Sequence, residues 1–546
     1  MSKIVPVQQI WPSEFVQRYQ QAGYWRGETF GQLLHSRAQA HPDRIAVVGG
    51  EQRWSYRELD ERASAIAKNL MKAGLKAGDR VLLHLPNIPE FISAAFGLFR
   101  AGMIPIYALP AHRITEIEHF ARNGEADAYI CADQHGGFDY RDLARELRSR
   151  YTALKHVFVV GEAQEFEAFD ALQQASDLDS MPVSVSSPQD VAFMQISGGS
   201  TGPSKLIPRT HDDYIYTLRE SARICGVTQD SVFLGALPIA HNFPMSSPGF
   251  MGTLYAGGRI VLSESPNPEA CFTLIEKEKV SFTSLVPPLL LLWLEAAPKS
   301  QHDLSSLEVI QVGGAKLIPE VAKRVKPTLN VTLQQVFGMA EGLVNYTRLG
   351  DDLDTIIETQ GRPISPDDEL LIVDDNDVPV AAGEAGHLLT RGPYTIRAYH
   401  NHEQANQRSF TQDGFYRTGD IVKLTDKGYL IVQGRAGDHI NRAGEKISAE
   451  EIEDYLLSHP QVFDAAVVSV PDEYLGERSC AFVISKGEKP RAVELKKWVR
   501  ERGIAEFKVP DQIVFVDAFT ETAVGKVSRK TLRAQLQAQL LQHAEK

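Results

Sequence analysis

The sequence predicts an α/β protein with a large N-terminal domain of two α/β layered subdomains plus a small β-barrel, and a small α+β C-terminal domain. Three observations lead to this prediction. At 546 residues the chain is too long for one ordinary hydrophobic core. Helical and strand-like patterns alternate up to about residue 340, which favours layered units with parallel sheets. From residue 368 the apolar segments become short and rich in β-branched residues.

The first 340 residues show the alternation in their apolar spacing. The most apolar run, Leu285–Leu294, is predicted to be a buried helix that begins at Pro287, because proline suits the first turn of a helix. The other patterns predict helices over Tyr56–Ala73 and Phe91–Ala101 and strands at Arg80–Leu85, Met103–Leu109, Val191–Met194, Val232–Leu234 and Val309–Val312.

The later part of the chain changes character. Strands such as Leu370–Val373, separated by Gly/Asp turns, predict a small antiparallel barrel or sheet over 368–433. A boundary near Gly434–Asp438 gives predicted domains of residues 1–435 and 436–546. Ser448–Glu451 has the pattern of a capping box, which opens a helix to about Ser458. The remaining patterns predict strands at Ala465–Val470, Cys480–Ile484 and Gln512–Val516 and a helix over Ala492–Arg502.

Composition narrows the class of protein. The net charge of −13 argues against a nucleic-acid binder. The four cysteines are far apart in the sequence, which disfavours a disulfide framework or zinc site and fits a reducing cytosol. The N-terminus lacks the apolar core of a signal peptide, and the run Leu285–Leu294 is too short to span a bilayer. We therefore expect a cytoplasmic protein with no membrane partner.

The stretch Ile196–Lys205 is the strongest chemical signal. Its glycines allow the backbone to approach a bound group, and successive N–H groups there can bind an anion. Its hydroxyls add donors, and its lysine adds a charge suited to phosphate. The alternative is a flexible surface loop. The stretch lacks the spacing of a Walker P-loop, so another fold would have to hold the nucleotide.

Four further motifs follow it along the chain. Taken singly, Glu341 suits the start of a helix, Asp420 a turn and Lys526 a solvated surface. They lie in the segments Gln335–Gly342, Tyr416–Asp420, Gly434–Ile447 and Ala523–Val527. In this order and at these separations the five motifs resemble those of the acyl-adenylate-forming (AMP-binding) enzymes, which include acyl-CoA ligases, luciferases and peptide-synthetase adenylation domains. The resemblance covers roughly residues 25–540.

Two stretches narrow the resemblance. Pro238–Gly249 resembles the acid-binding segment of stand-alone aryl-acid ligases, which activate 2,3-dihydroxybenzoate or salicylate in siderophore biosynthesis, and Gly342–Leu349 matches the same subgroup. The resemblance implies that an aryl acid and ATP give aryl-AMP and pyrophosphate, and that the aryl group then passes to the phosphopantetheine thiol of an aryl carrier protein. The family carries out this reaction with Mg²⁺.

The resemblance also implies roles for individual residues of the nucleotide site. Glu341 is expected to bind Mg²⁺, and Asp420, with Arg435 nearby, to hold the ribose hydroxyls. The β- and γ-phosphates are assigned to Ser197, Gly198, Gly199, Ser200, Thr201, Gly202 and Lys205. The adenine slot is assigned to Gly313, Gly314, Ala315, Val336 and Phe337, and Gly338 and Val432 complete the predicted ATP/AMP-binding residues.

The resemblance implies a mobile C-terminal domain, which rotates between the two half-reactions. Lys526 is expected to reach the acid carboxylate and the α-phosphate, and His241 is the second catalytic candidate, although a lone histidine is more often structural. Asp438 matches the hinge position, where a few residues absorb the backbone change. Gly444 is expected to line a pantetheine tunnel in the second conformation.

The acid pocket is expected at five residues. Asn242 stands where amino-acid-activating relatives place an aspartate, so a neutral amide faces the acid and amino acids should be excluded. Phe243 replaces a tyrosine often seen there. Small Ser247 and Val344 leave room for a 3-hydroxyl, and Ala340 completes the set. This favours 2,3-dihydroxybenzoate, with salicylate as the alternative.

Two other functions stay open at this point. An aryl-CoA ligase would use free coenzyme A as the thiol, and a nucleotide-binding regulator would have lost catalysis. The latter disagrees with the presence of Lys205, Glu341, Asp420 and Lys526. The sequence shows no carrier serine site after the small domain, so we expect the carrier protein to act in trans.

Overall fold

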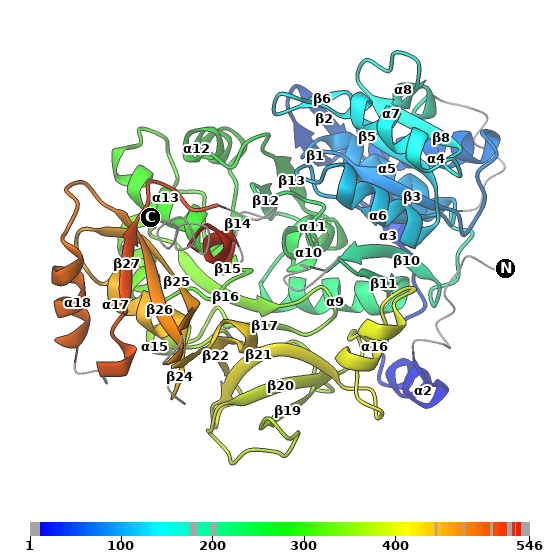
Figure 1. Ribbon diagram of the computed structural model, residues 1–546. Coiled ribbons are helices and arrows are strands. Elements are labelled where there is room, and N and C mark those ends of the chain that lie inside the picture. The colour runs from blue at the N-terminus through cyan, green and yellow to red at the C-terminus, as the bar shows by residue number, and fades with distance from the viewer. Residues whose placement is uncertain are drawn as a thin grey trace.

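The computed structural model describes residues 11–174, 183–197, 204–442, 445–472, 475–502, 506–520, 527–529 and 531–536. Two large β-sheets form the main body. Figure 1 shows the seven-stranded sheet at the upper right, in blue and cyan, and the nine-stranded sheet in the centre, largely in green. The yellow strands β19–β22 lie below them, and the orange C-terminal strands lie to one side.

The nine-stranded sheet has the order β18-β17-β16-β15-β14-β12-β13-β1-β2. Its strands from β1 to β16 are parallel in the middle, and antiparallel strands close both edges. They are β1 (Ile45–Gly49), β2 (Gln52–Ser55), β12 (Val232–Gly235), β13 (Arg259–Leu262), β14 (Phe282–Leu285), β15 (Val309–Gly313), β16 (Thr332–Gly338), β17 (Val344–Tyr346) and β18 (Arg362–Pro363).

The seven-stranded sheet has the order β11-β10-β4-β3-β5-β8-β9. All its neighbours are parallel except β10 and β11, which form an antiparallel pair. The strands are β3 (Arg80–His84), β4 (Ile104–Tyr107), β5 (Ala126–Ala132), β8 (His156–Val160), β9 (Glu167–Ala168), β10 (Val191–Ile196) and β11 (Leu206–Thr210). A separate pair consists of β6 (Gln134–His135) and β7 (Phe138–Asp139).

The chain contributes strands to the two large sheets in alternation. The early strand β1 pairs with β13 of the nine-stranded sheet, whereas the later strand β10 pairs with β4 of the seven-stranded sheet. The two α/β units are therefore interleaved in sequence.

Residues 369–435 form the antiparallel sheet β19 (Glu369–Val373), β20 (Gly386–Arg391), β21 (Tyr416–Leu424) and β22 (Leu430–Arg435), in that order. This is the small β unit predicted from the short strands. The C-terminal sheet contains β23 (Ile440–Arg442), β24 (Glu445–Ile447), β25 (Val462–Asp472), β26 (Gly476–Ser485) and β27 (Gln512–Phe515).

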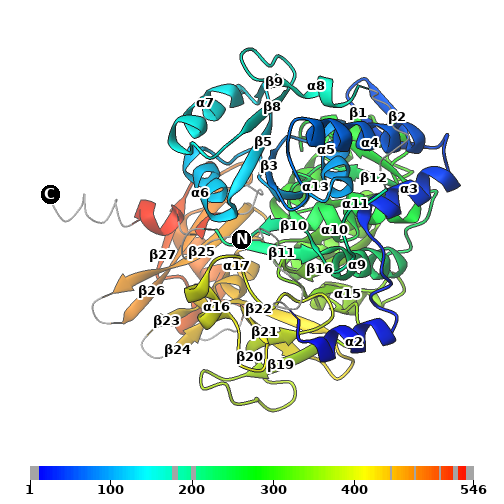
Figure 2. The same ribbon diagram turned by 90° about the vertical axis from the view of Figure 1, so that its right-hand side faces the viewer.

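The helices cover these sheets, as the two views in Figures 1 and 2 show. Those of the first half are α2 (Ser13–Gln21), α3 (Phe30–Ala40), α4 (Tyr56–Lys72), α5 (Pro89–Arg100), α6 (Ile114–Gly124), α7 (Tyr140–Arg150), α8 (Phe169–Leu172), α9 (His211–Ile224), α10 (Asn242–Ser246), α11 (Gly249–Ala256) and α12 (Pro268–Glu278). The others are α13 (Pro287–Ala296), α14 (Pro319–Leu329), α15 (Leu353–Glu358), α16 (Glu403–Ser409), α17 (Ala449–Leu457) and α18 (Ala492–Arg500), with short 3₁₀ turns at Ala297–Lys299, Ala436–Asp438 and Glu506–Lys508.

Local signals explain where several helices begin. Helix α13 starts at Pro287 as predicted and buries most of its apolar residues, although Leu292 is 47% exposed. At α17, Ser448 Oγ accepts a hydrogen bond from the Glu451 N–H, which is one half of the predicted capping box. The Glu451 carboxylate is engaged by Lys508 Nζ at 2.8 Å.

The C-terminal elements have hydrophobic clusters of their own, around Ile452 and Val467 on one face of the sheet and around Val468 and Leu532 on the other. Contacts still join them to the rest of the chain. Lys486 Nζ lies 2.7 Å from Glu295 of α13. Within the residues described, no helix combines the length and apolarity needed to cross a membrane.

Candidate active site

The ends of the glycine-rich stretch are fastened to each other. The Ser197 N–H donates to the Lys205 carbonyl at 2.9 Å, and the Lys205 N–H donates to Ser197 Oγ at 2.9 Å. These two bonds continue the pairing of β10 with β11. Ser197 is buried and Lys205 half-buried. Five predicted phosphate-binding residues lie outside the described residues: Gly198, Gly199, Ser200, Thr201 and Gly202.

A buried tyrosine joins this stretch to the predicted magnesium ligand. The Tyr399 hydroxyl donates to Glu341 Oε1 at 2.8 Å, and Lys205 Nζ lies 5.0 Å from the centre of the Tyr399 ring. Tyr416 lies on the other side, with its hydroxyl 3.2 Å from that of Tyr399. Burial and the nearby Glu341 carboxylate raise the pKa of Tyr399, so its hydroxyl remains a donor. The site therefore gathers a cation and a carboxylate around one phenol.

The loop that carries Glu341 is held by its backbone. The Ile396 N–H donates to the Glu341 carbonyl at 2.8 Å, and Arg209 Nη1 donates to the Ala340 carbonyl at 2.8 Å. A β-carbon on Gly342, whose φ is +155°, would lie 2.5 Å from Thr395 Cα, so only glycine fits. The loop is therefore preorganised from two directions, by β11 and by the segment before α16.

The predicted adenine slot lies at the carboxyl ends of two parallel strands. Gly313, the last residue of β15, pairs with Val336 of β16. A β-carbon at Gly313 would lie 2.7 Å from the Val336 carbonyl and 3.0 Å from Phe243 Cζ. Because Phe243 belongs to the predicted acid pocket, the two predicted subsites adjoin here. Further along, Phe337 is half-buried and Gly338 exposed.

The remaining slot residues lie near these strand ends. Gly314, with φ of +80°, and exposed Ala315 follow β15 directly. Val432 lies in β22, and its N–H donates to Gln360 Oε1 at 2.7 Å.

The predicted ribose residues form an ion pair across β21 and β22. Asp420 is buried, and its Oδ1 lies 2.9 Å from Arg435 Nε. Arg435 Nη1 also donates to the Thr418 carbonyl at 2.9 Å. The Asp420 charge raises the pKa of Arg435, and Tyr416 and Glu341 contribute to the same field. The negative charges of Asp420 and Glu341 both favour the protonated form of the Arg435 guanidinium.

Helix α10 carries the predicted acid pocket. His241 caps this helix, and its Nδ1 accepts a hydrogen bond from the Phe243 N–H at 3.3 Å. Asn242 is buried, and its Oδ1 accepts from the Tyr214 hydroxyl at 2.8 Å. Ser247, at the end of the helix, is buried.

Val344 approaches the same region from β17. It is buried, and its N–H donates to the Tyr394 hydroxyl at 3.3 Å. It pairs with Gly338 of β16, directly beyond the loop that holds Ala340 and Glu341.

The predicted hinge residue is tied to the C-terminal part of the chain. Asp438 Oδ1 lies 2.6 Å from Arg533 Nη2, and Asp438 Oδ2 lies 3.7 Å from Arg529 Nη1. Lys526 and Gly444, the predicted catalytic lysine and tunnel glycine, lie outside the described residues.

The donor set around Glu341 suits a hard cation that phosphate also ligates. Mg²⁺ takes carboxylate oxygens and commonly reaches a protein through one or two carboxylates plus substrate phosphates. Among the residues described, no group of three or more His, Cys, Asp or Glu could hold a metal ion by itself. Glu341, held by Tyr399, is consistent with a site that ATP would complete.

Sequence reasoning missed three residues that hold this site together. Tyr399, Arg209 and Tyr214 contact Glu341, Ala340 and Asn242 respectively. Each is a single residue with no spacing rule of its own. Arg209 and Tyr214 could have been suspected only because they lie within ten residues of the glycine-rich stretch.

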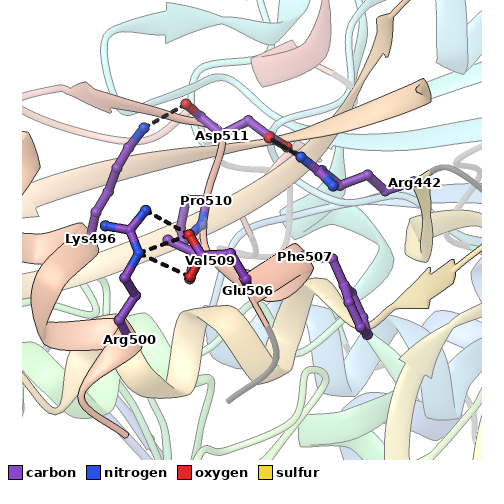
Figure 3. Close-up of a pocket in the computed structure, with 8 residues that line it drawn as sticks. All are labelled: Arg442, Lys496, Arg500, Glu506, Phe507, Val509, Pro510 and Asp511. Carbon is purple, nitrogen blue, oxygen red and sulfur yellow. Dashed lines mark hydrogen bonds and ion pairs between the residues drawn. The ribbon is translucent and has the colours of Figure 1, made fainter. Parts of the chain in front are cut away.

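A groove of about 500 Å³ lies away from these residues, on the C-terminal part of the chain (Figure 3). Its cations are already paired: Arg442 with Asp511 at 2.8 Å, and Arg500 with Glu506 at 2.8 Å. Lys496 Nζ donates to the Asp511 carbonyl at 2.6 Å. None of the predicted site residues lines it.

Comparisons with known proteins show the family to which this chain is related. The profile of the AMP-binding enzyme family matches residues 34–400, and that of the AMP-binding enzyme C-terminal domain matches residues 451–526. The chain is 56% identical to the 2,3-dihydroxybenzoate-AMP ligase of Bacillus subtilis (strain 168), over 97% of this chain and 98% of that one. It is 44% identical to a salicyl-AMP ligase / salicyl-S-ArCP synthetase of Mycobacterium tuberculosis, over 96% and 94%.

A solved structure agrees with these relatives. The apo structure of Mycobacterium smegmatis MbtA superposes with a TM-score of 0.75 at 44% identity, over 98% of this chain and 99% of that one. The two matched family profiles span both the N-terminal and the C-terminal part of the fold. The chain belongs to the AMP-binding enzyme family.

Proposed function

We propose that this chain activates an aryl acid with ATP, giving an aryl-AMP and pyrophosphate, and then passes the aryl group to a thiol in siderophore biosynthesis. The observation that carries the proposal is the contact between the two predicted subsites. Phe243 of the acid segment lies against Gly313, which pairs with Val336 of the nucleotide segment. Relatives named for 2,3-dihydroxybenzoate and salicylate support the class of acid.

The first half-reaction needs two anions held together. A carboxylate oxygen of the acid attacks the α-phosphorus of ATP, the new carbon–oxygen–phosphorus bridge forms, and the bond to the β-phosphate breaks to release pyrophosphate. Lys205 and the glycine-rich stretch would hold the leaving phosphates, and Lys526 would neutralise charge at the reacting oxygens. Bound Mg²⁺ would supply charge neutralisation between the phosphates and Glu341.

The second half-reaction is thioester formation. The thiol sulfur attacks the acyl carbon, AMP leaves with the bridging oxygen, and the thiol proton is lost. We propose that the domain of residues 436–546 rotates about Asp438 relative to the domain of residues 1–435. This rotation would take Lys526 away from the reacting oxygens and bring Gly444 to the acyl group. We propose as the acceptor the phosphopantetheine thiol of an aryl carrier protein.

Asn242, Ser247 and Val344 favour 2,3-dihydroxybenzoate in this proposal. A neutral amide does not neutralise an α-ammonium group, and a buried group left unpaired costs about 1–3 kcal/mol. The test is ATP–pyrophosphate exchange with 2,3-dihydroxybenzoate, salicylate, benzoate and amino acids. We expect the highest kcat/KM with 2,3-dihydroxybenzoate and no measurable exchange with amino acids. The proposal would be refuted by exchange that only amino acids stimulate, or by exchange that does not depend on any added acid.

The acceptor is tested separately. Purified enzyme, ATP and 2,3-dihydroxybenzoate are incubated either with a phosphopantetheinylated aryl carrier protein or with coenzyme A, and acylated product is measured by mass spectrometry. We expect acylated carrier protein. Rapid acylation of coenzyme A with an unloaded carrier protein would instead assign an aryl-CoA ligase.

A further inference from the structure

One buried tyrosine binds the side chain of Asn242, a residue of the predicted acid pocket. Tyr214 of α9 is fully buried, and its hydroxyl donates to Asn242 Oδ1 at 2.8 Å. Ser246 Oγ lies 3.5 Å from the same oxygen. The carbonyl end of the Asn242 amide is therefore occupied by the protein, and its NH₂ end is turned away from Tyr214.

The position of the Tyr214 ring is fixed on several sides. The ring of Phe193 meets it edge to face, with centroids 4.6 Å apart. The Arg209 guanidinium lies 4.7 Å from the Tyr214 ring centre and forms a buried ion pair with Asp213 at 2.7 Å. Burial raises the pKa of Tyr214, so the hydroxyl keeps its proton at every working pH. The Tyr214 hydroxyl therefore stays protonated, and its ring is packed so that this donor lies against Asn242.

We propose that Tyr214 is a positioning residue that makes Asn242 a hydrogen-bond donor toward the ortho substituent of the acid, so that the site accepts ortho-hydroxy acids and rejects ortho-amino acids. This inference rests on the proposed function. The Arg209 side chain extends the same support, because it also donates a hydrogen bond to the carbonyl of Ala340, another residue of the predicted pocket.

The chemistry of the two acid classes explains the selection. In an ortho-hydroxybenzoate the hydroxyl proton bonds to its own carboxylate, and the hydroxyl oxygen presents lone pairs outward. An NH₂ donor from Asn242 matches those lone pairs. In an ortho-aminobenzoate the second N–H points outward, so two donors would face each other in a buried site. Unpaired buried donors of this kind give strong discrimination between substrates.

Tyr214→Phe tests the inference, because it removes the hydroxyl and keeps the ring. The Asn242 amide would then be able to rotate and present either end. Tyr216→Phe is the matched control: Tyr216 lies in the same helix, is buried, and donates to Ser365 Oγ at 2.7 Å instead. ATP–pyrophosphate exchange is measured for wild type and both variants with salicylate and with anthranilate, and thermal unfolding is recorded for each.

We expect Tyr214→Phe to raise the KM for salicylate about tenfold with little change in kcat, and to lower the salicylate-to-anthranilate ratio of kcat/KM by at least about tenfold. Tyr216→Phe should keep the wild-type ratio. The inference is overturned if Tyr214→Phe keeps that ratio, or if both variants change it equally. If the wild-type enzyme catalyses ATP–pyrophosphate exchange with none of the aryl acids, the proposed function itself is overturned instead.

Discussion

Tyr399 donates its phenolic proton to Glu341 Oε1 at 2.8 Å, and this bond joins a residue of the segment before α16 to the loop between β16 and β17. Lys205 lies over the same ring. The relationship matters because Glu341 is the proposed magnesium ligand, and the carboxylate has one orientation while the bond persists.

Tyr399→Phe removes this bond and keeps the ring under Lys205. We expect kcat for pyrophosphate exchange to fall about tenfold and the Mg²⁺ concentration for half-maximal rate to rise, since losing one buried hydrogen bond to a charged group costs about 1.5–3 kcal/mol. The KM for the aryl acid should not change. Tyr429→Phe is the control, because its hydroxyl binds Asp351 instead. Wild-type magnesium dependence in Tyr399→Phe would contradict the assigned role.

Lys526→Ala separates the two half-reactions. The lysine charge is needed where carboxylate and α-phosphate meet, so exchange should be lost while thioester formation from supplied aryl-AMP is largely kept. Lys497→Ala, on an exposed part of α18, is the control for removal of a lysine. Equal loss of both activities would show that the lysine has another role.

Asp438→Pro restricts the proposed hinge. We expect thioester formation to fall at least about tenfold while pyrophosphate exchange stays near wild type, because only the second step needs the backbone change. Asp438→Ala is the matched control, since it removes the ion pairs with Arg533 and Arg529 and leaves φ unrestricted. If the proline and alanine variants behave alike, the side chain and not the hinge explains the loss.

Val344→Leu adds one methylene group at a buried position of the proposed acid pocket. The added group should fill the room left for a 3-hydroxyl, so kcat/KM for 2,3-dihydroxybenzoate should fall about tenfold relative to salicylate. Exchange assays with both acids measure the ratio. An unchanged ratio would place the 3-hydroxyl elsewhere.

Two carboxyls of α17 predict a pH effect on stability. Burial raises the pKa of Glu450 and that of Asp454 to about 7. Their pKa values in an unfolded chain are near 4, so the folded chain binds more protons between about pH 4.5 and pH 7. The free energy of unfolding should therefore fall as pH rises through this window.

Glu450→Gln tests this effect. Between pH 5 and pH 7.5, the free energy of unfolding of the variant should fall by on the order of 2 kcal/mol less than that of wild type. Urea unfolding at each pH measures this difference. Glu451→Gln, whose carboxylate pairs with Lys508, is the control on the same helix. A wild-type slope in Glu450→Gln would show that this carboxyl is not the group that titrates.

Local sequence patterns predicted individual elements well and their assembly less well. Helix α4 and strand β3 lie where the sequence predicts them, because the helical spacing of three or four residues and the short apolar run of a buried strand are both local features. The placement of β1 in one large sheet and of β10 in the other depends on pairing with strands more than 80 residues away, and no local pattern encodes such pairing.

The candidate site also combines residues that local motifs predict with contacts that only the tertiary fold shows. The resemblance predicted roles for Ser197, Lys205, Glu341, Asp420 and Asn242, because their motifs are short and follow a fixed order. The contacts that hold them depend on the tertiary fold: Tyr399 is 58 residues from Glu341, and Tyr214 is 28 residues from Asn242. Similarly, Trp25 Nε1 donates to the Pro393 carbonyl across 368 residues, next to the segment that supports Glu341.

The most direct test follows the oxygen atoms of the acid. 2,3-Dihydroxybenzoate labelled with ¹⁸O in both carboxylate oxygens is incubated with the enzyme, ATP, Mg²⁺ and a thiol acceptor, and the released AMP and pyrophosphate are analysed by mass spectrometry. If the carboxylate attacks the α-phosphorus, each AMP carries one ¹⁸O and the pyrophosphate carries none. AMP without label, or label in the pyrophosphate, would contradict the account.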